Sequence, residues 1–303
     1  MIGCRQILIG VIPRMFFLCL LLLPDLAYGL TISPLRQTIT LDHGKKQEIS
    51  VRLRNEETSE IMVTPMVEAF RLEERTGRPI FGVKDEAIQW VTSTWSNIRL
   101  RPGEEREAVF VIQAPANAEP GGHYLGLFLA GAPLGGGLSA GARVGSLLFL
   151  YVAGEVSEKL ETVQFSSEAN WNLYGPVRLT LKLRNSGTIH VIPDGNVTIE
   201  TRSGRIVAER GINQDRRKVL PGDDWVGEYV FDGLSPSDLG KLTVTARIEY
   251  GLGAQKIIER TDFWRLPIVT ILILICVAAG AIAAVIARRS RQRGMTNSYE
   301  DIS

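Results

Sequence analysis

The chain has 303 residues, and its 34 Lys and Arg residues nearly balance its 33 Asp and Glu residues, which gives a formal net charge of +1. Basic and acidic residues are interspersed, and this excludes the clustered basic face that a nucleic-acid-binding protein presents. Apolar residues make up 45% of the chain, more than a soluble domain needs, and the excess lies at the two ends.

The first 29 residues are predicted to be a signal peptide. Arg14 precedes a short apolar run at 15–23, and the small residues Ala27 and Gly29 stand at positions −3 and −1 before the predicted cleavage point. A basic start, an apolar run and small residues in this order are typical of a cleaved secretory signal. An uncleaved anchor is the alternative, for which the run is short.

Between Leu30 and Phe263, apolar and polar residues alternate with a period of two. The clearest runs are 49–54, 179–184 and 242–250, whereas 147–152 is almost continuously apolar. A period of two predicts strands with one buried face, and a short continuous apolar run predicts a central strand. Pro-Gly and Asp-Gly turns separate these runs, as in all-β sandwiches.

An internal repeat divides this β region into two tandem immunoglobulin-like β-sandwich domains, predicted at 30–156 and 157–263. The matching segments are 51–55 with 181–185, and 101–103 with 220–222. The first copy contains an insertion, 71–87, whose charge and Thr76-Gly77 turn predict an exposed hairpin or loop. Helical periodicity is scarce, although 85–97 could form a short helix.

Residues 266–287 contain no charged side chain and predict a transmembrane helix. At 1.5 Å per residue they span about 33 Å, enough to cross the hydrocarbon core of a bilayer. Four arginines follow within 288–303, which predicts a cytoplasmic tail and extracytoplasmic N-terminal domains. Trp264 precedes the span, where aromatic residues anchor at the membrane interface.

No motif in the sequence predicts a catalytic residue, a metal ligand or a cofactor site. The segment 137–141 matches G-x-S-x-G, but it lies in a Gly-rich loop, 131–141, and not between a strand and a helix of an α/β sheet. The same loop lacks the closing Lys-Ser/Thr of a phosphate-binding loop. The histidines are well separated, and every cysteine lies in an apolar end, which argues against a metal site. The histidines and cysteines are His43, His123, His190, Cys4, Cys19 and Cys276.

Other polar and aromatic residues have structural explanations. Glu104-Glu105 and Asp223-Asp224 follow Pro-Gly turns at matching repeat positions, so we expect solvated turn tips. Four tryptophans could stack on sugar rings, but aromatic residues in sandwiches usually fill the core. These are Trp90, Trp95, Trp171 and Trp225. The sequon 196–198 is meaningful only in a eukaryotic host.

Several segments together resemble the bacterial WxL-interacting protein family. They are 32–37, 41–44, 51–55, 100–103, 120–124, 143–147 and 185–191. The resemblance implies a signal peptide, two immunoglobulin-like domains, one C-terminal span and a short basic tail. It also implies a first domain that binds peptidoglycan and a second that binds WxL-type surface proteins or host factors. The motifs are turn and strand signatures and transfer no binding residue.

These features predict a non-enzymatic, membrane-anchored scaffold of the bacterial cell envelope, with peptidoglycan or a surface protein as its partner. The alternative is a chaperone-like module that accepts a partner's strand by β-augmentation during surface-protein assembly. A sensor is a third hypothesis, although the tail at 294–303 is too short for a signalling domain. We expect 131–141 and 71–87 to provide the contacts, because loops on rigid sandwiches commonly carry binding.

Overall fold

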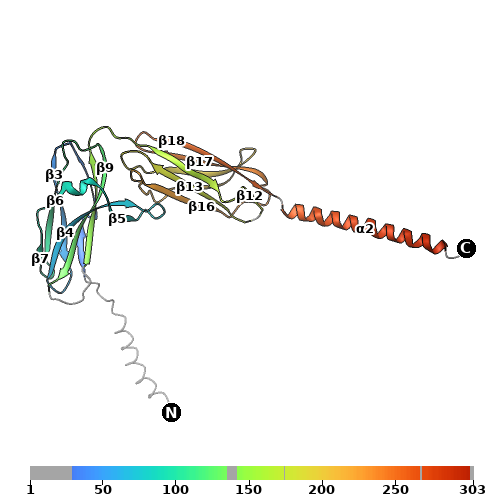
Figure 1. Ribbon diagram of the computed structural model, residues 1–303, viewed down its shortest axis with the longest axis horizontal. Helices are drawn as coiled ribbons and strands as arrows, with labels where there is room; N and C mark the ends of the chain where they lie inside the picture. The colour runs from blue at the N-terminus through green and yellow to red at the C-terminus, as the bar shows by residue number, and fades with distance from the viewer. Residues whose placement is uncertain (1–28, 135–141, 174, 267, 301–303) are drawn as a thin grey trace, which may run out of the picture.

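The computed structural model describes residues 29–134, 142–173, 175–266 and 268–300. It confirms the predicted fold class: four β-sheets form two immunoglobulin-like sandwiches, and an apolar helix follows them. The strands of the first sandwich run across those of the second, so the two domains together have the outline of an L (Figure 1). The helix extends away from the far end of the second sandwich (Figure 1).

The first sandwich places one sheet in the order β1-β3-β8-β6 against another in the order β2-β10-β9-β4-β5, with β7 paired to β4. Its first strand is split between the two sheets, because β1 pairs antiparallel with β3 and β2 pairs parallel with β10. A cis Ser33–Pro34 bond lies at the crossing. The strand bounds are β1 Leu30–Ser33, β2 Arg36–Leu41, β3 Lys46–Asn55, β4 Ile61–Leu72, β5 Pro79–Val83, β6 Val91–Ser93, β7 Ile98–Leu100, β8 Glu105–Gln113, β9 Gly121–Pro133 and β10 Ala142–Val152.

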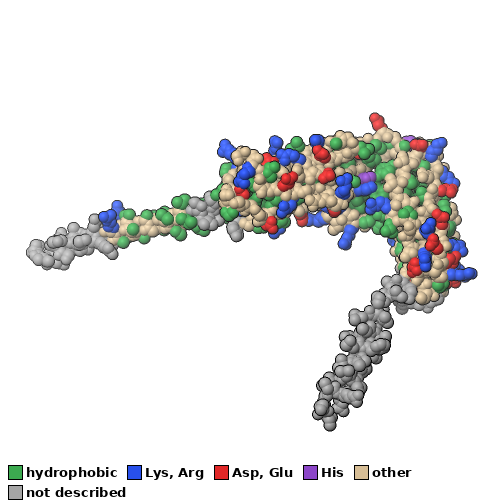
Figure 2. All heavy atoms as spheres, turned by 180° about the vertical axis from the view of Figure 1, so that it is seen from behind, with side chains coloured by type: hydrophobic (Ala, Val, Ile, Leu, Met, Phe, Trp, Pro, Cys, Tyr) green, Lys and Arg blue, Asp and Glu red, His purple; other side chains and the backbone are tan. Residues whose placement is uncertain are grey.

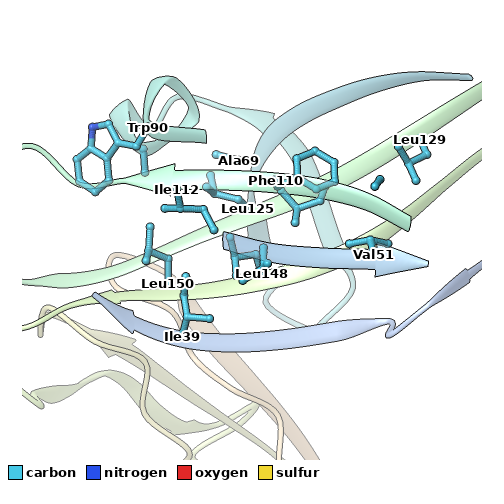
Figure 3. Packing of buried hydrophobic residues seen from close by; sticks show 14 of the residues in the cluster. Ile39, Val51, Ala69, Trp90, Phe110, Ile112, Leu125, Leu129, Leu148 and Leu150 are labelled. Atoms are coloured by element: carbon cyan, nitrogen blue, oxygen red, sulfur yellow. The ribbon is translucent and has the colours of Figure 1, made fainter. Parts of the chain in front are cut away.

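The core of the first sandwich lies between its two sheets (Figure 3). Val51 of β3 and Phe110 of β8 are fully buried against Leu125 of β9 and Leu148 of β10. Trp90 belongs to the same core and lies at one end of it (Figure 3). Because side chains alternate along a strand, each strand contributes every second residue to this layer, as the period-two pattern predicts.

The second sandwich repeats the arrangement with fewer strands. Its sheets have the orders β11-β13-β16 and β12-β18-β17-β14-β15, and its first strand is again split, since β11 pairs antiparallel with β13 and β12 pairs parallel with β18. Buried residues from both sheets, such as Leu181, Phe231 and Phe263, form its core. The strand bounds are β11 Leu160–Ser167, β12 Trp171–Asn172, β13 Val177–Asn185, β14 Asp194–Thr201, β15 Ile206–Ile212, β16 Asp224–Phe231, β17 Gly240–Tyr250 and β18 Gln255–Arg265.

One asparagine organises the same turn in each sandwich. Asn55 is fully buried at the end of β3, and its Nδ2 donates to the carbonyls of Ser59 at 2.9 Å and Leu100 at 3.1 Å. Its Oδ1 accepts the Glu57 N–H at 2.9 Å. Asn185 at the end of β13 makes the three equivalent bonds. Buried polar groups need such partners, which explains why the repeat ends in asparagine both times.

The Pro-Gly turns of the repeat close against these asparagines. The Gly103 N–H donates to the Asn55 carbonyl at 2.8 Å, and the Gly222 N–H donates to the Asn185 carbonyl at 2.8 Å. Both glycines have a φ near +75°, at 72° and 77°, where a residue without Cβ is favoured. The two matching segments of the sequence repeat are therefore joined in space by the same hydrogen bonds.

The short helix predicted over 85–97 is wrong in extent and type. A 3₁₀ helix, η1, covers only Glu86–Trp90, and the Asp85 carboxylate caps it by accepting the Ala87 N–H at 2.9 Å. The chain then becomes strand β6, which pairs with β8. The apolar residues that suggested a helix face pack instead on the core of the first sandwich, Val91 from a strand.

The C-terminal helix α2 covers Ile268–Glu300. Its segment Ile271–Arg289 has a mean hydropathy of 2.6 and is not covered by the rest of the protein. Among the described residues this is the one helix long and apolar enough to cross a membrane. A helix that is apolar and exposed all round fits a lipid environment better than water.

Candidate functional site

The hairpin of β4 and β5 joins the first sandwich to the second. Its tip lies in the predicted insertion 71–87, which forms a hairpin as expected. Arg75 and Thr76 at the tip are exposed, but the tip also contacts β16 of the second sandwich, which the sequence did not predict. The Val226 N–H donates to the Glu74 carbonyl at 3.0 Å, and Lys182 Nζ lies 3.0 Å from the Glu74 carboxylate. Arg75 forms an ion pair with Glu228. These contacts hold the two domains in one relative orientation.

Asp223 is buried beneath the same hairpin, although the sequence suggested a solvated turn tip. Its Oδ2 accepts the Leu72 N–H at 2.8 Å across the domain boundary. Burial raises the pKa of the Asp223 carboxyl, and the bond from Leu72 opposes that change. Its neighbour Asp224 keeps a low pKa because Arg184 and Lys182 contact it. The neighbouring domain, which sequence pattern does not reveal, accounts for the wrong prediction at Asp223.

An aromatic cluster fills the rest of the boundary. Phe70, Tyr124 and Phe149 project from the outer face of the β4-β9-β10 sheet and form one buried cluster with Leu220 of the second sandwich. The rings meet edge to face, with Phe149 and Tyr124 centroids 5.5 Å apart. The Tyr124 hydroxyl accepts the His190 N–H at 2.9 Å. Edge-to-face rings and a satisfied hydroxyl favour a single packing arrangement.

Two basic side chains from different domains meet over one ring of this cluster. The Arg36 guanidinium carbon lies 5.4 Å from the Phe149 ring centroid, and Lys218 Nζ lies 4.2 Å from it. Neither side chain has a carboxylate partner within the described part of the chain. Burial lowers the pKa of Lys218, and the nearby Arg36 charge adds to this. We call Arg36, Lys218 and Phe149 the cationic junction; basic side chains and histidine are visible where the sandwiches meet (Figure 2).

His190 lies beside the cationic junction. Its ring is 6.1 Å from the Phe149 ring, and its Nδ1 is hydrogen-bonded to the Tyr151 hydroxyl. Burial, reinforced by the Lys218 charge, lowers the pKa of His190 to about 4. The imidazole is therefore neutral at pH 7, and the positive charge at this place comes from Arg36 and Lys218.

Acidification should destabilise the domain boundary through His190. Its pKa is lower when folded than the ordinary value of 6.5, so the unfolded chain takes up the proton first as pH falls. The contribution of the neutral His190 ring to folding stability is therefore complete above about pH 6.5 and is lost as pH falls toward 4. We expect the unfolding midpoint in urea to fall less between these pH values for His190→Gln than for the wild type. His43→Gln, on an exposed turn, should follow the wild type, and equal pH dependence of all three proteins would contradict the assignment.

One edge of β10 is unpaired next to the cationic junction. β2 covers only Leu147–Val152, and no strand within the described ranges pairs with that side of Ala142–Ser146. The Leu147 N–H donates to the carbonyl of Leu35, the residue just before β2, at 2.9 Å. Since N–H groups alternate in direction along a strand, those of Arg143 and Gly145 point to the same side. Two N–H and two carbonyl groups are thus available to an added strand.

The other residues singled out from sequence lie apart from this site. The G-x-S-x-G segment and most of its Gly-rich loop lie outside the described residues. His123 bonds to Asp85 at 2.9 Å in the first sandwich. Trp90, Trp95 and Trp225 pack in the cores as expected, but Trp171 is exposed, so the core prediction is wrong there. In the part of the chain that is described, no group of three or more His, Cys, Asp or Glu side chains could hold a metal ion.

Sequence reasoning missed the two basic residues of the junction. Arg36 lies in a strand with ordinary alternation, and Lys218 ends the basic run 216–218 just before a Pro-Gly turn. That run is a weak signal, because charged turns are usually solvated. Arg36 and Lys218 are 182 positions apart in the sequence, so no local pattern would pair them.

No protein-family model matches the chain, and no curated protein sequence matches it. The expected membership in the WxL-interacting family therefore remains a prediction. Solved structures of several chaperones share its two-domain immunoglobulin-like fold. The class 5 fimbriae chaperone CfaA has 12% sequence identity and a TM-score of 0.43, with 77% of this chain and 99% of that chain covered. The YadV chaperone has 16% identity and a TM-score of 0.40, with 77% and 99% covered. The periplasmic chaperone SfaE has 14% identity and a TM-score of 0.36, with 78% and 100% covered. At these identities the likeness concerns the fold alone.

Proposed function

We propose that this chain is a non-enzymatic, membrane-anchored binding module that accepts an extended segment of a partner protein as an added strand on β10. The unpaired edge at Ala142–Ser146 carries the proposal, because open edges with aligned N–H and carbonyl groups recruit extended chains. This is the chaperone-like alternative to a wall scaffold. The names of the similar structures agree with it but supply no evidence for it.

The position of β2 suggests how the partner segment would be oriented. β2 runs parallel to β10 and starts where the open edge ends, with Arg36 opposite Leu147. A partner strand that also ran parallel to β10 would end at Arg36 and the cationic junction. Its terminal carboxylate would then lie between two cations, and hydrogen bonds to charged groups contribute about 1.5–3 kcal/mol each. The preferred ligand is therefore an extended peptide with a free C-terminal carboxylate.

The helix α2 would hold this site close to a membrane. Its apolar segment is followed by arginines at 288–293, and basic residues collect on the cytoplasmic side of a span. Both sandwiches would then lie outside the plasma membrane, with the second next to the bilayer. Tethering raises the effective concentration of the β10 edge near newly translocated chains or the cell wall. Contacts that are weak individually would then still give stable binding.

Arg143→Pro tests strand addition directly. Its N–H points away from β9, so proline there would remove one edge donor and leave the β9–β10 ladder intact. We expect Arg143→Pro to bind a nine-residue alternating Val-Thr peptide at least about 5-fold more weakly than Arg143→Ala, since one hydrogen bond contributes about 1 kcal/mol. Fluorescence anisotropy with the labelled peptide and the detergent-solubilised full chain would measure this.

The alanine variant is the matched control. It also lacks the contacts that Arg143 makes with Phe128 and Glu68, so the two variants differ in the backbone N–H. Equal affinities of Arg143→Pro and Arg143→Ala would contradict strand addition at β10. Retention of the ectodomain by purified wall sacculi, with no peptide binding, would favour the wall scaffold instead.

A further inference from the structure

Two tryptophans stack on each other at the end of the second sandwich that leads into the helix. Trp171 of β12 pairs in register with Trp264 of β18, and their rings are 6.0 Å apart with an interplanar angle of 22°. They remain 58% and 45% exposed. Trp171 is the tryptophan that the core prediction misplaced.

Two exposed leucines lie at the same end. Asn172 and Gly240 both pair with Arg265. Leu173, which follows β12, and Leu239, which precedes β17, therefore lie on either side of the end of β18. They are 50% and 43% exposed. We call Trp171, Leu173, Leu239 and Trp264 the apolar rim. Single exposed apolar residues are ordinary, but four at one end of a domain indicate an interaction surface.

The helix determines what faces this rim. Only four residue steps separate Trp264 from Ile268, the first residue of α2, which limits their separation to about 14 Å even for a fully extended chain. The apolar segment of the helix begins three residues later, at Ile271. Tryptophan rings favour the headgroup level of a bilayer, where one part of the ring is dry and the N–H is wet.

The charges on the adjoining face complement a lipid surface. A hollow of about 770 Å³ on the outer face of the β12-β18-β17-β14-β15 sheet is lined by Arg202, Lys241, Arg260 and Trp264 among others. Lys241 is paired with Asp262, whereas Arg202 and Arg260 have no ion-pair partner among the described residues. The lining holds these three basic residues against two acidic ones, Glu200 and Asp262. The resulting net positive charge next to the rim attracts lipid phosphates over a distance of about 10 Å.

We propose that the apolar rim inserts into the outer headgroup layer of the membrane that α2 crosses. The second sandwich is then held against the bilayer at two points, the helix and the rim, and does not swing freely on the short connection. Residues far apart in sequence form this contact, so it is distinct from anchoring by the helix. It rests on the membrane anchorage in the proposed function and is independent of strand acceptance.

Quenching by brominated lipid tests the rim in the full-length protein. The chain would be reconstituted into phosphatidylcholine vesicles containing phosphatidylglycerol, with or without bromine on the upper acyl carbons. Two of the five tryptophans belong to the rim, so we expect bromine to remove up to about two fifths of the emission. Trp171→Phe should reduce the quenched emission by about half. Trp95→Phe, in the first sandwich, should leave the quenched emission unchanged.

The Trp171→Phe variant distinguishes insertion of the whole rim from quenching of Trp264 alone, which its proximity to the helix would explain. If bromine quenches Trp264 alone and Trp171→Phe changes nothing, the rim does not contact lipid. Absence of quenching, with energy transfer between differently labelled copies in one vesicle, would assign the rim to a second copy of the chain. Both results would overturn the proposal and leave strand acceptance intact. Extraction of the protein by alkaline carbonate would overturn the rim together with the anchorage.

Discussion

Replacing Asn185 with alanine is expected to destabilise the second sandwich by about 3–5 kcal/mol. The side chain is buried and makes three hydrogen bonds of 2.8–2.9 Å, to the Ile189 and Val219 carbonyls and from the Gly187 N–H. Alanine would leave the Ile189 carbonyl and the Gly187 N–H without partners, while the Val219 carbonyl would keep only the Val191 N–H. Each buried unsatisfied group costs about 1–3 kcal/mol.

Hydrogen–deuterium exchange of the full chain would localise this effect. A loss of about 3 kcal/mol should accelerate exchange in β13 and β16 by about 100-fold, because each 1.4 kcal/mol corresponds to a factor of ten. Strands of the first sandwich should change less. Asn196→Ala is the matched control, since Asn196 makes an exposed bond to Glu209 and its loss should cost under about 0.5 kcal/mol. Similar exchange in the two variants would show that the buried asparagine does not organise the turn.

Reversing both charges of the cationic junction is expected to abolish carboxylate recognition. In Arg36→Glu/Lys218→Glu, two attractive contacts would be replaced by two repulsive ones above the Phe149 ring. We expect affinity for the free-carboxylate Val-Thr peptide to fall at least about 100-fold, equivalent to about 2.7 kcal/mol. Fluorescence anisotropy at constant ionic strength would measure the change, since salt screens such contacts.

Two controls distinguish carboxylate recognition from misfolding. The same peptide with a C-terminal amide should bind the wild type and the double variant with similar, weaker affinities. Lys45→Glu/Arg99→Glu alters two exposed residues of the first sandwich by the same total charge and should bind the acid peptide nearly as tightly as the wild type does. If the acid and amide peptides bind the wild type equally, the junction does not recognise a terminal carboxylate.

The architecture followed from local signals in the sequence. Alternation in segments such as 49–54 and 179–184 predicts strands because successive side chains point to opposite faces, and this property needs no knowledge of the partner strand. The repeat ending in Asn55 and Asn185 was readable for a similar reason, since the turn satisfies its polar groups largely within a few residues. The apolar segment of α2 was likewise predictable, because composition and length alone match a bilayer.

The arrangement between the domains was decided only in the tertiary structure. Asp223 follows a Pro-Gly turn just as Glu104 does, yet it is buried because a hairpin from the other domain covers it. Trp171 resembles the core tryptophans in sequence, yet it lies exposed beside Trp264. A period-two pattern predicts which residues share one face of a strand, but it does not predict whether another domain, another sheet or solvent contacts that face.

The candidate site depends on the same distinction. Local sequence determined the strands that carry Arg36 and Arg143, but the extent of β2 decided which part of β10 remained unpaired. The packing of two sandwiches brought Lys218 over the ring that Arg36 also approaches. Strand formation depends on neighbours two residues away, whereas an open edge and a pair of like charges depend on residues more than a hundred positions apart. For this reason the sequence alone predicted a β-sandwich protein with a membrane anchor, and only the tertiary structure showed which part of β10 is left unpaired.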